Sequence, residues 1–285
     1  MALNHSLVGK RFGPGVRSWT SDDAIIYALG VGAGQDPFAE LDVTTENTTG
    51  IPQRALPTFV TVLGVRELLP PLGDFDPAML VHAEQSIELF AAVPVSGTIE
   101  VFRTVLGMHD KGKGALVRTE TEAVVPATGQ PMWRSSSSMF IRGEGGFGGE
   151  SAPSTPWNRP DRAPDHLVRF TTRPEQALIY RLSGDRNPLH SDPAFAARGG
   201  FAAPILHGLC TYGFAGRALL RTLCDGDPER FGSMSARFSA VVVPGDELTV
   251  SVWHGVDGSA SFQVSRGDGV VVLDRGTFRT REGSA

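Results

Sequence analysis

Polar and apolar residues alternate near the end of the chain in the pattern of half-buried β-strands. The run Glu247 to Val252 alternates at every position, and a period of two places one face of a strand against a core. Asp257-Gly258 and Asp268-Gly269 follow it as typical hairpin turns. Before it, Val243-Pro244-Gly245-Asp246 has Pro and Gly where a type II turn needs them. The pattern predicts an antiparallel meander of strands.

Helical signals come before the strands in each half of the chain. Ser21-Asp22-Asp23 and Thr172-Arg173-Pro174-Glu175 have the acidic residues and proline typical of a first helical turn. A longer apolar segment from His207 to Cys224 opens with small residues and predicts a longer helix. Helices followed by a meander of strands indicate an α+β fold, not an alternating parallel one.

The chain divides near its middle into two similar halves. Residues Gly143 to Pro164 are rich in Gly, Ser and Pro and predict no regular element. Three short matches recur in the same order at offsets of 153, 147 and 148: Ala24–Leu29 with Ala177–Leu182, Ala55–Pro57 with Ala202–Pro204, and Val95–Gly97 with Val243–Gly245. They indicate a duplicated unit, although generic helix starts and turns can match by chance. We assign residues 1–145 and 161–285 to the two units and 146–160 to a linker.

Charge and composition narrow the class of protein. The formal net charge is −5 and no run of Lys or Arg occurs, so we expect no nucleic-acid partner. The two cysteines, Cys210 and Cys224, make no disulfide framework. No apolar segment approaches the length that crosses a bilayer, and the start of the chain lacks the character of a signal peptide. We expect a soluble, cytoplasmic protein without a membrane partner.

The segment Tyr180 to His190 holds the clearest candidate chemistry. Asp185 and His190 lie five residues apart with Asn187 and Pro188 between them, so an irregular turn is expected there and not a helix. Such a turn can direct both side chains into one cavity. It can equally be a structural loop, because Asp and Asn before Pro often form Asx turns. Spacing alone leaves both interpretations open.

A second candidate is the segment Ala203 to Leu209, which ends at the start of the longer predicted helix. The unpaired N–H groups of a helix N-terminus attract negative charge. Gly208 has no side chain to block a ligand, so its N–H is suited to an oxyanion hole. The alternative is that Gly208 allows close helix packing, and the two interpretations are compatible.

Together these two segments resemble the hydratase 2 signature of MaoC-like proteins. The resemblance implies that Asp185 and His190 flank one water and that the Gly208 N–H binds a thioester carbonyl. It also implies that Asn187 orients the pair. Arg186, Pro188 and Leu189 complete the first run and are expected at the substrate site.

The resemblance covers most of the chain. Four further segments are similar to two-domain, eukaryote-like hydratase 2 enzymes: Leu80–Gln85, Asp110–Gly114, Phe140–Gly149 and Arg237–Gly245. It implies that His82, Ala83, Lys111 and Phe238 contact acyl-CoA, although relatives commonly have Gly at the position of Ala83. It also implies a double hotdog fold, in which each half wraps an antiparallel sheet around a central helix, with the two sheets joined side by side.

At the offset of 153, Asp185 corresponds to Gly32 and His190 to Pro37, so the first half lacks both reactive groups. We therefore expect one active site per chain, with the first half providing room for the acyl chain. His5, His109 and His254 are scattered, so no metal site and no cofactor besides the CoA of the substrate are expected.

The resemblance implies reversible syn hydration of trans-2-enoyl-CoA to (R)-3-hydroxyacyl-CoA in fatty-acid metabolism, by a homodimer. An imidazole is suited to proton exchange near neutral pH. Which of Asp185 and His190 is the formal base stays open. Two alternatives also stay open: a 3-hydroxyacyl-thioester dehydratase acting in lipid synthesis, and a non-catalytic module that binds acyl thioesters.

Overall fold

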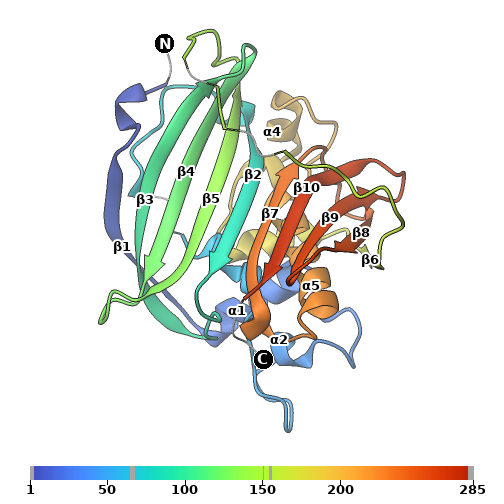
Figure 1. Ribbon diagram of the computed structural model, residues 1–285. Coiled ribbons are helices and arrows are strands. Elements are labelled where there is room, and N and C mark those ends of the chain that lie inside the picture. The colour runs from blue at the N-terminus through green and yellow to red at the C-terminus, as the bar shows by residue number, and fades with distance from the viewer. Residues whose placement is uncertain (1–2, 65–67, 150, 154–155, 282–285) are drawn as a thin grey trace.

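The computed structural model describes residues 3–64, 68–149, 151–153 and 156–281. These residues form an antiparallel sheet of ten strands in the order β1-β3-β4-β5-β2-β7-β10-β9-β8-β6 (Figure 1). The strands are β1 (Arg11–Trp19), β2 (Leu80–Leu89), β3 (Gly97–Asp110), β4 (Gly114–Val124), β5 (Pro131–Arg142), β6 (His166–Thr171), β7 (Phe231–Phe238), β8 (Glu247–His254), β9 (Ser259–Arg266) and β10 (Val271–Thr280).

Helices cover one side of this sheet. The α-helices are α1 (Ser21–Gly30), α2 (Leu41–Thr44), α3 (Gln176–Tyr180), α4 (Pro193–Arg198) and α5 (Gly208–Leu223). Short 3-10 helices are η1 (His5–Leu7), η2 (Pro57–Val62), η4 (Pro77–Met79), η5 (Arg181–Ser183), η6 (Pro188–His190) and η7 (Pro228–Arg230). Among the described residues, no helix is long and apolar enough to cross a membrane.

The two halves of the chain meet where β2 pairs with β7. Their register runs from Glu84 opposite Arg237 to Glu88 opposite Ser233, so the sheet continues from one half into the other. Strands β1 to β5 lie on one side of this junction and β6 to β10 on the other. The described residues between β5 and β6 contain no helix or strand, as the Gly, Ser and Pro content predicted. The α+β prediction of two sheets joined side by side is confirmed.

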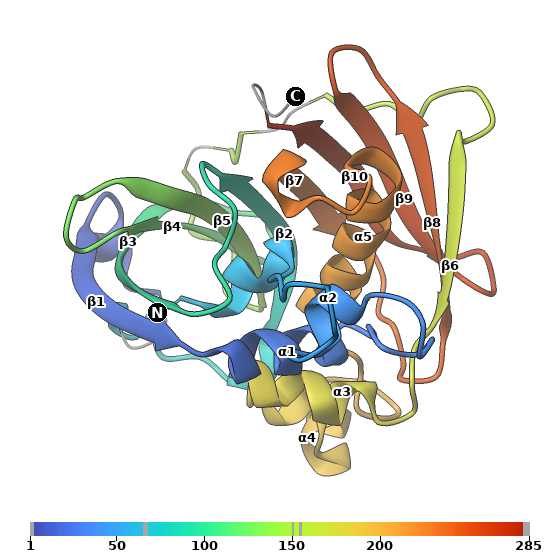
Figure 2. The ribbon, with the colours of Figure 1, turned by 90° about the horizontal axis from the view of Figure 1, so that it is seen from below.

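The second half has a complete central helix. Strands β7, β10, β9, β8 and β6 curve around α5 (Figure 2), which buries eleven consecutive residues from Cys210 to Leu220. His207 and Cys224 cap α5, so the predicted longer helix is confirmed. The hairpin at Asp257 and Gly258 is confirmed as well, and the φ angles of 50° and 70° are those of a type I′ turn. Burial of α5 against the sheet forms the largest part of the core.

Among its described residues, the first half has no counterpart of α5 at full length. The predicted start at Ser21 is confirmed, because Thr20 and Asp23 form a capping box at α1. After it, among the described residues, η2 occupies the place of the central helix, and Gly64, Pro70 and Pro71 near its end disfavour a regular helix. The strongly curled sheet of β1, β3, β4, β5 and β2 (Figure 2) therefore surrounds an interior that no long helix fills, as far as the structure describes this half.

Candidate active site

A cavity of about 750 Å³ lies between the two halves. From the second half it is lined by the loop from Ser183 to His190, the start of α5, and Phe238 at the end of β7. From the first half it is lined by β1, β2, β3, β4 and β5 and by the segment that follows η2. The truncated central helix of the first half therefore creates much of this space.

The loop of the predicted catalytic pair is held by its own hydrogen bonds. The backbone N–H of Asn187 donates to Oδ1 of Asp185 at 3.2 Å. The Asn187 side chain accepts from the Leu189 N–H at 3.1 Å and so caps η6, which ends at His190. Along the loop, Asp185, Asn187 and Leu189 line the cavity. Asn187 thus links the backbone positions of the acid and the imidazole, and its orienting role stays a prediction.

A backbone carbonyl sets the tautomer of His190. Its Nδ1 lies 2.8 Å from the carbonyl oxygen of Ile205, and a carbonyl oxygen can only accept. The neutral ring therefore has its proton on Nδ1 and its lone pair on Nε2. Since His190 is only 9% exposed and lines the cavity, Nε2 is the nitrogen suited to accept a proton there.

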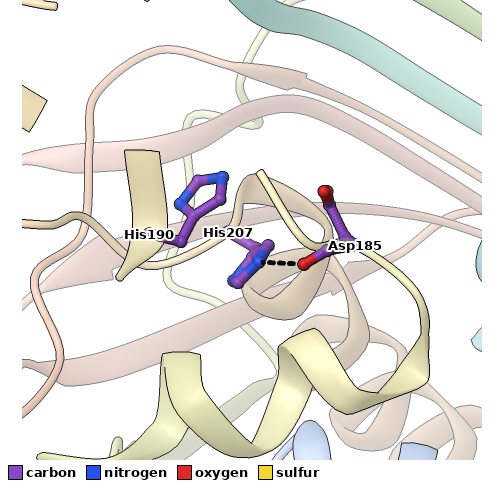
Figure 3. Close-up of side chains that lie close together, drawn as sticks. All are labelled: Asp185, His190 and His207. Atoms are coloured by element: carbon purple, nitrogen blue, oxygen red, sulfur yellow. Dashed lines mark hydrogen bonds between the residues drawn. The ribbon is translucent and has the colours of Figure 1, made fainter. Parts of the chain in front are cut away.

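His207 is a further residue of the site, and the sequence did not single it out. Its Nε2 donates to the backbone carbonyl of Asp185 at 3.1 Å, and its ring stacks on His190 with centroids 3.7 Å apart (Figure 3). Only 1% of His207 is exposed. The one signal in the sequence was its place directly before Gly208. Its contact with both Asp185 and His190 requires the folded chain.

A carboxylate and two imidazoles meet at this site, and both types of side chain can bind metal ions. They belong to Asp185, His190 and His207. Their potential ligand atoms all lie within 4.8 Å of one another. The lone pair of an imidazole lies in the plane of its ring, however, and these two planes differ by only 27° in a stacked pair. Because the two rings are stacked with centroids 3.7 Å apart, an ion in the plane of one ring lies outside the plane of the other, which does not suit a tetrahedral ion shared between them.

Gly208 begins α5 and lies against an aromatic wall. As the first residue of the helix, its N–H has no acceptor in a preceding helical turn. A Cβ at this position would lie 3.0 Å from the ring of Phe238. The Phe238 ring in turn contacts that of His82, with centroids 4.9 Å apart. The structure thus brings Gly208, Phe238 and His82 into one wall of the cavity, and their contacts with a substrate stay predictions.

His82 is a neutral histidine near the candidate acid. Its Nε2 donates to the carbonyl of Glu84 at 3.0 Å. Burial lowers the pKa of His82 to about 4, against the opposing effects of this hydrogen bond and of the negative charge of Asp185. It is therefore uncharged at neutral pH.

Four of the residues predicted to bind substrate do not line the cavity. Arg186 and Pro188 are exposed on the outer side of the catalytic loop. Ala83 lies in an irregularity of β2 beside His82, and Lys111 is exposed at the turn between β3 and β4. Their contacts with the CoA part of a ligand stay predictions.

The counterparts of the catalytic pair in the first half do not line the cavity either. Gly32 is packed under Phe214, whose ring lies 2.2 Å from the place of an added Cβ. Pro37 is exposed. Within the described residues, the reactive groups of this cavity come from the second half.

Two family models match the chain. The MaoC like domain matches residues 156–274, and the MFE-2 hydratase 2 N-terminal domain matches residues 18–143. The 3-hydroxyacyl-thioester dehydratase Y of Mycobacterium tuberculosis is 42% identical over 287 residues, which are 97% of this chain and 98% of that protein. The enoyl-CoA hydratase ChsH3 of the same organism is 43% identical over 277 residues, or 93% and 94% of the two chains.

Solved structures agree in fold. The crystal structure of a MaoC-like dehydratase from Phytophthora capsici matches with a TM-score of 0.85 and 32% identity, covering 99% of both chains. A Mycobacterium tuberculosis protein described as having a double hotdog fold matches with a TM-score of 0.59 over 96% of both chains. The double hotdog architecture is thus confirmed.

Proposed function

The chain belongs to the MaoC-like hydratase 2 family, and on this premise we propose that it reversibly hydrates trans-2-enoyl-CoA to (R)-3-hydroxyacyl-CoA in fatty-acid metabolism. The observation that carries the proposal is the meeting of Asp185 and His190 in a cavity whose wall includes the N-terminus of α5. A module that only binds thioesters has no need of this acid and imidazole.

The thioester carbonyl would be held at the start of α5. Hydration of the double bond places negative charge on the thioester oxygen as an enolate forms. The Gly208 N–H, at the positive end of a sixteen-residue helix, would stabilise this charge. Phe238 and His82 would exclude water from the same wall.

Asp185 and His190 would share the attacking water. The water oxygen adds to the β-carbon of the enoyl group while the pair accepts one proton. The pair returns one proton to the α-carbon from the same face, so its proton count is unchanged and the addition is syn. His190 Nε2 is suited to the exchange because Nδ1 is held by Ile205.

The same groups would catalyse the reverse reaction, which is dehydration of a 3-hydroxyacyl thioester. The second candidate function is therefore a dehydratase acting in lipid synthesis, favoured by the 42% identity to the 3-hydroxyacyl-thioester dehydratase Y. Both candidates use one site, and the supply of substrate sets the direction.

Four further expectations belong to this proposal. The protein would act as a homodimer in the cytoplasm, with acyl-CoA as its ligand. No metal or organic cofactor would be needed, because an acid–imidazole pair and an N–H donor suffice for the reaction.

The test is turnover of crotonyl-CoA and longer trans-2-enoyl-CoA thioesters, followed by loss of the enoyl absorbance and by coupling to an (R)-specific dehydrogenase. Formation of the (R) product from CoA thioesters is the expected result. Formation of the (S) product, or binding of acyl-CoA without turnover, would contradict the proposal.

A further inference from the structure

The inner end of the cavity, within the first half, has a polar wall. Trp133, Ser135 and Ser137 alternate along β5, and all three line the cavity. In the second half the matching interior of the sheet is apolar, where Val250, Val252, Phe262 and Val264 are buried against α5. The two interiors therefore differ in chemistry as well as in the space that they leave.

The polar residues form a continuous row across neighbouring strands. Ser135 on β5 pairs with Thr121 on β4, and Thr121 pairs with Arg103 on β3. Arg103 and Thr121 line the cavity as well. Arg17 on β1 adds a second guanidinium to the same cavity. Since register places these side chains on one face, the row is a feature of the folded sheet and not of one segment.

Hydrogen bonds within the row direct a donor toward the cavity. Ser137 donates to Oε1 of Gln85 at 2.7 Å, and Nε2 of Gln85 donates to Oγ of Ser135 at 2.7 Å. Ser135 accepts the last of these hydrogen bonds, so its own hydroxyl hydrogen is available to donate. The chain of hydrogen bonds thus ends in a donor at a residue that lines the cavity.

Two further donors at this end are buried without an acceptor among the described residues. They are Nε1 of Trp133, a residue that is 2% exposed, and Nε of Arg17. A buried donor without an acceptor is costly and rare in native proteins. Among the described residues that line the cavity, Asp185 is the single acidic one, and it belongs to the catalytic loop. An anionic acceptor at the inner end would therefore come from a ligand.

We propose that this inner end receives an acyl chain that terminates in a carboxylate, so that ω-carboxylated enoyl-CoA thioesters are preferred substrates. A carboxylate accepts several hydrogen bonds, and a guanidinium is its best-matched partner. A plain hydrocarbon chain would instead cover the guanidinium of Arg17 and the hydroxyl of Ser135 without giving them an acceptor. The inference rests on the proposed function, because it identifies the acyl group of the same thioester.

The experiment compares two series of trans-2-enoyl-CoA thioesters, matched in length, of which one bears a terminal carboxylate. At one or more lengths we expect kcat/KM of the carboxylated substrate to exceed that of its partner roughly ten-fold, as a charge-assisted hydrogen bond typically supplies. Calorimetry with the saturated thioesters measures the same preference in binding, where no turnover is needed.

Substitutions at the inner end of the cavity test whether its residues cause the preference for the carboxylated substrate. Arg17→Met should reduce the ratio of the two kcat/KM values roughly ten-fold. Arg11→Met is the matched control, since Arg11 is on the same strand, is exposed and pairs with Glu122 outside the cavity. If Arg17→Met does not fold, Ser135→Ala provides a second test of the same ratio.

The outcomes separate the inference from the proposed function. If kcat/KM of the plain thioester equals or exceeds that of its carboxylated partner at every length, the inference is overturned. The proposed function is then left intact. A preference that Arg17→Met and Ser135→Ala both leave unchanged would also overturn it. If neither series is hydrated, the proposed function fails and the inference fails with it.

Discussion

His207 stacks on His190 with ring centroids 3.7 Å apart and donates from Nε2 to the backbone carbonyl of Asp185. One buried ring therefore touches both members of the candidate catalytic pair. It fixes the backbone of the acid and one face of the imidazole, so we infer a positioning role for His207.

Loss of either member of the pair should abolish most of the turnover. Asp185→Asn and His190→Gln should each reduce kcat at least ~100-fold, because general acid–base groups typically contribute that much. The double variant should be hardly slower than either single one, since both residues act on one water. Steady-state kinetics checks the rates, and calorimetry should show that acyl-CoA still binds. Folded variants with near wild-type rates would contradict the mechanism.

A change at His207 should act through the geometry of the pair. His207→Phe keeps a ring on His190 but removes the donor to Asp185. We expect kcat to fall roughly ten-fold and the free energy of unfolding to fall by about 1 kcal/mol, the usual value of one lost hydrogen bond. His207→Gln, which can still donate to this carbonyl, should recover part of the rate. The pH profile of kcat should move in His207→Phe, and an unchanged profile would indicate a purely structural role.

Protonation of His82 should destabilise the protein in mild acid. Its pKa is about 4 in the folded chain and about 6.5 when unfolded. Between these values the unfolded state binds more protons, so the free energy of unfolding decreases as pH falls from about 6.5 to about 4, by at most roughly 3 kcal/mol. Chemical denaturation at a series of pH values checks this. The slope over this range should be smaller in His82→Asn, and an equal slope would assign it to other groups.

Removal of metal should leave the activity intact. The stacked rings of His190 and His207 do not suit a shared ion, and the proposed reaction needs none. After exhaustive chelation and dialysis, we expect the rate of enoyl-CoA hydration to stay within experimental error of the untreated enzyme. A loss of rate that Zn²⁺ restores would show that Asp185, His190 and His207 form a metal site.

Local features of the fold could be predicted from the sequence because they depend on neighbouring residues. The capping box at Thr20, the extent of α5 and the type I′ turn at Asp257-Gly258 follow from periodicity and turn chemistry within a few positions. α3 begins at Gln176, after a turn at Pro174 and Glu175, so the helix start predicted near Thr172 was only approximate. Asp185, His190 and Gly208 were found by their motifs, and the fold brings them to one cavity.

Other features of the site depend on contacts between segments that are far apart in the sequence. His207 gained its contacts only when the start of α5 met the catalytic loop, and the row from Ser135 through Thr121 to Arg103 exists only in the register of β5, β4 and β3. A one-residue change of register would turn such a row to the other face, and no local pattern encodes that pairing. The sequence by itself therefore indicated the family, the helices α1 and α5 and the candidate reactive groups. Only the tertiary structure determined the stacked histidines and the polar inner end of the cavity, because both depend on contacts between residues far apart in the chain.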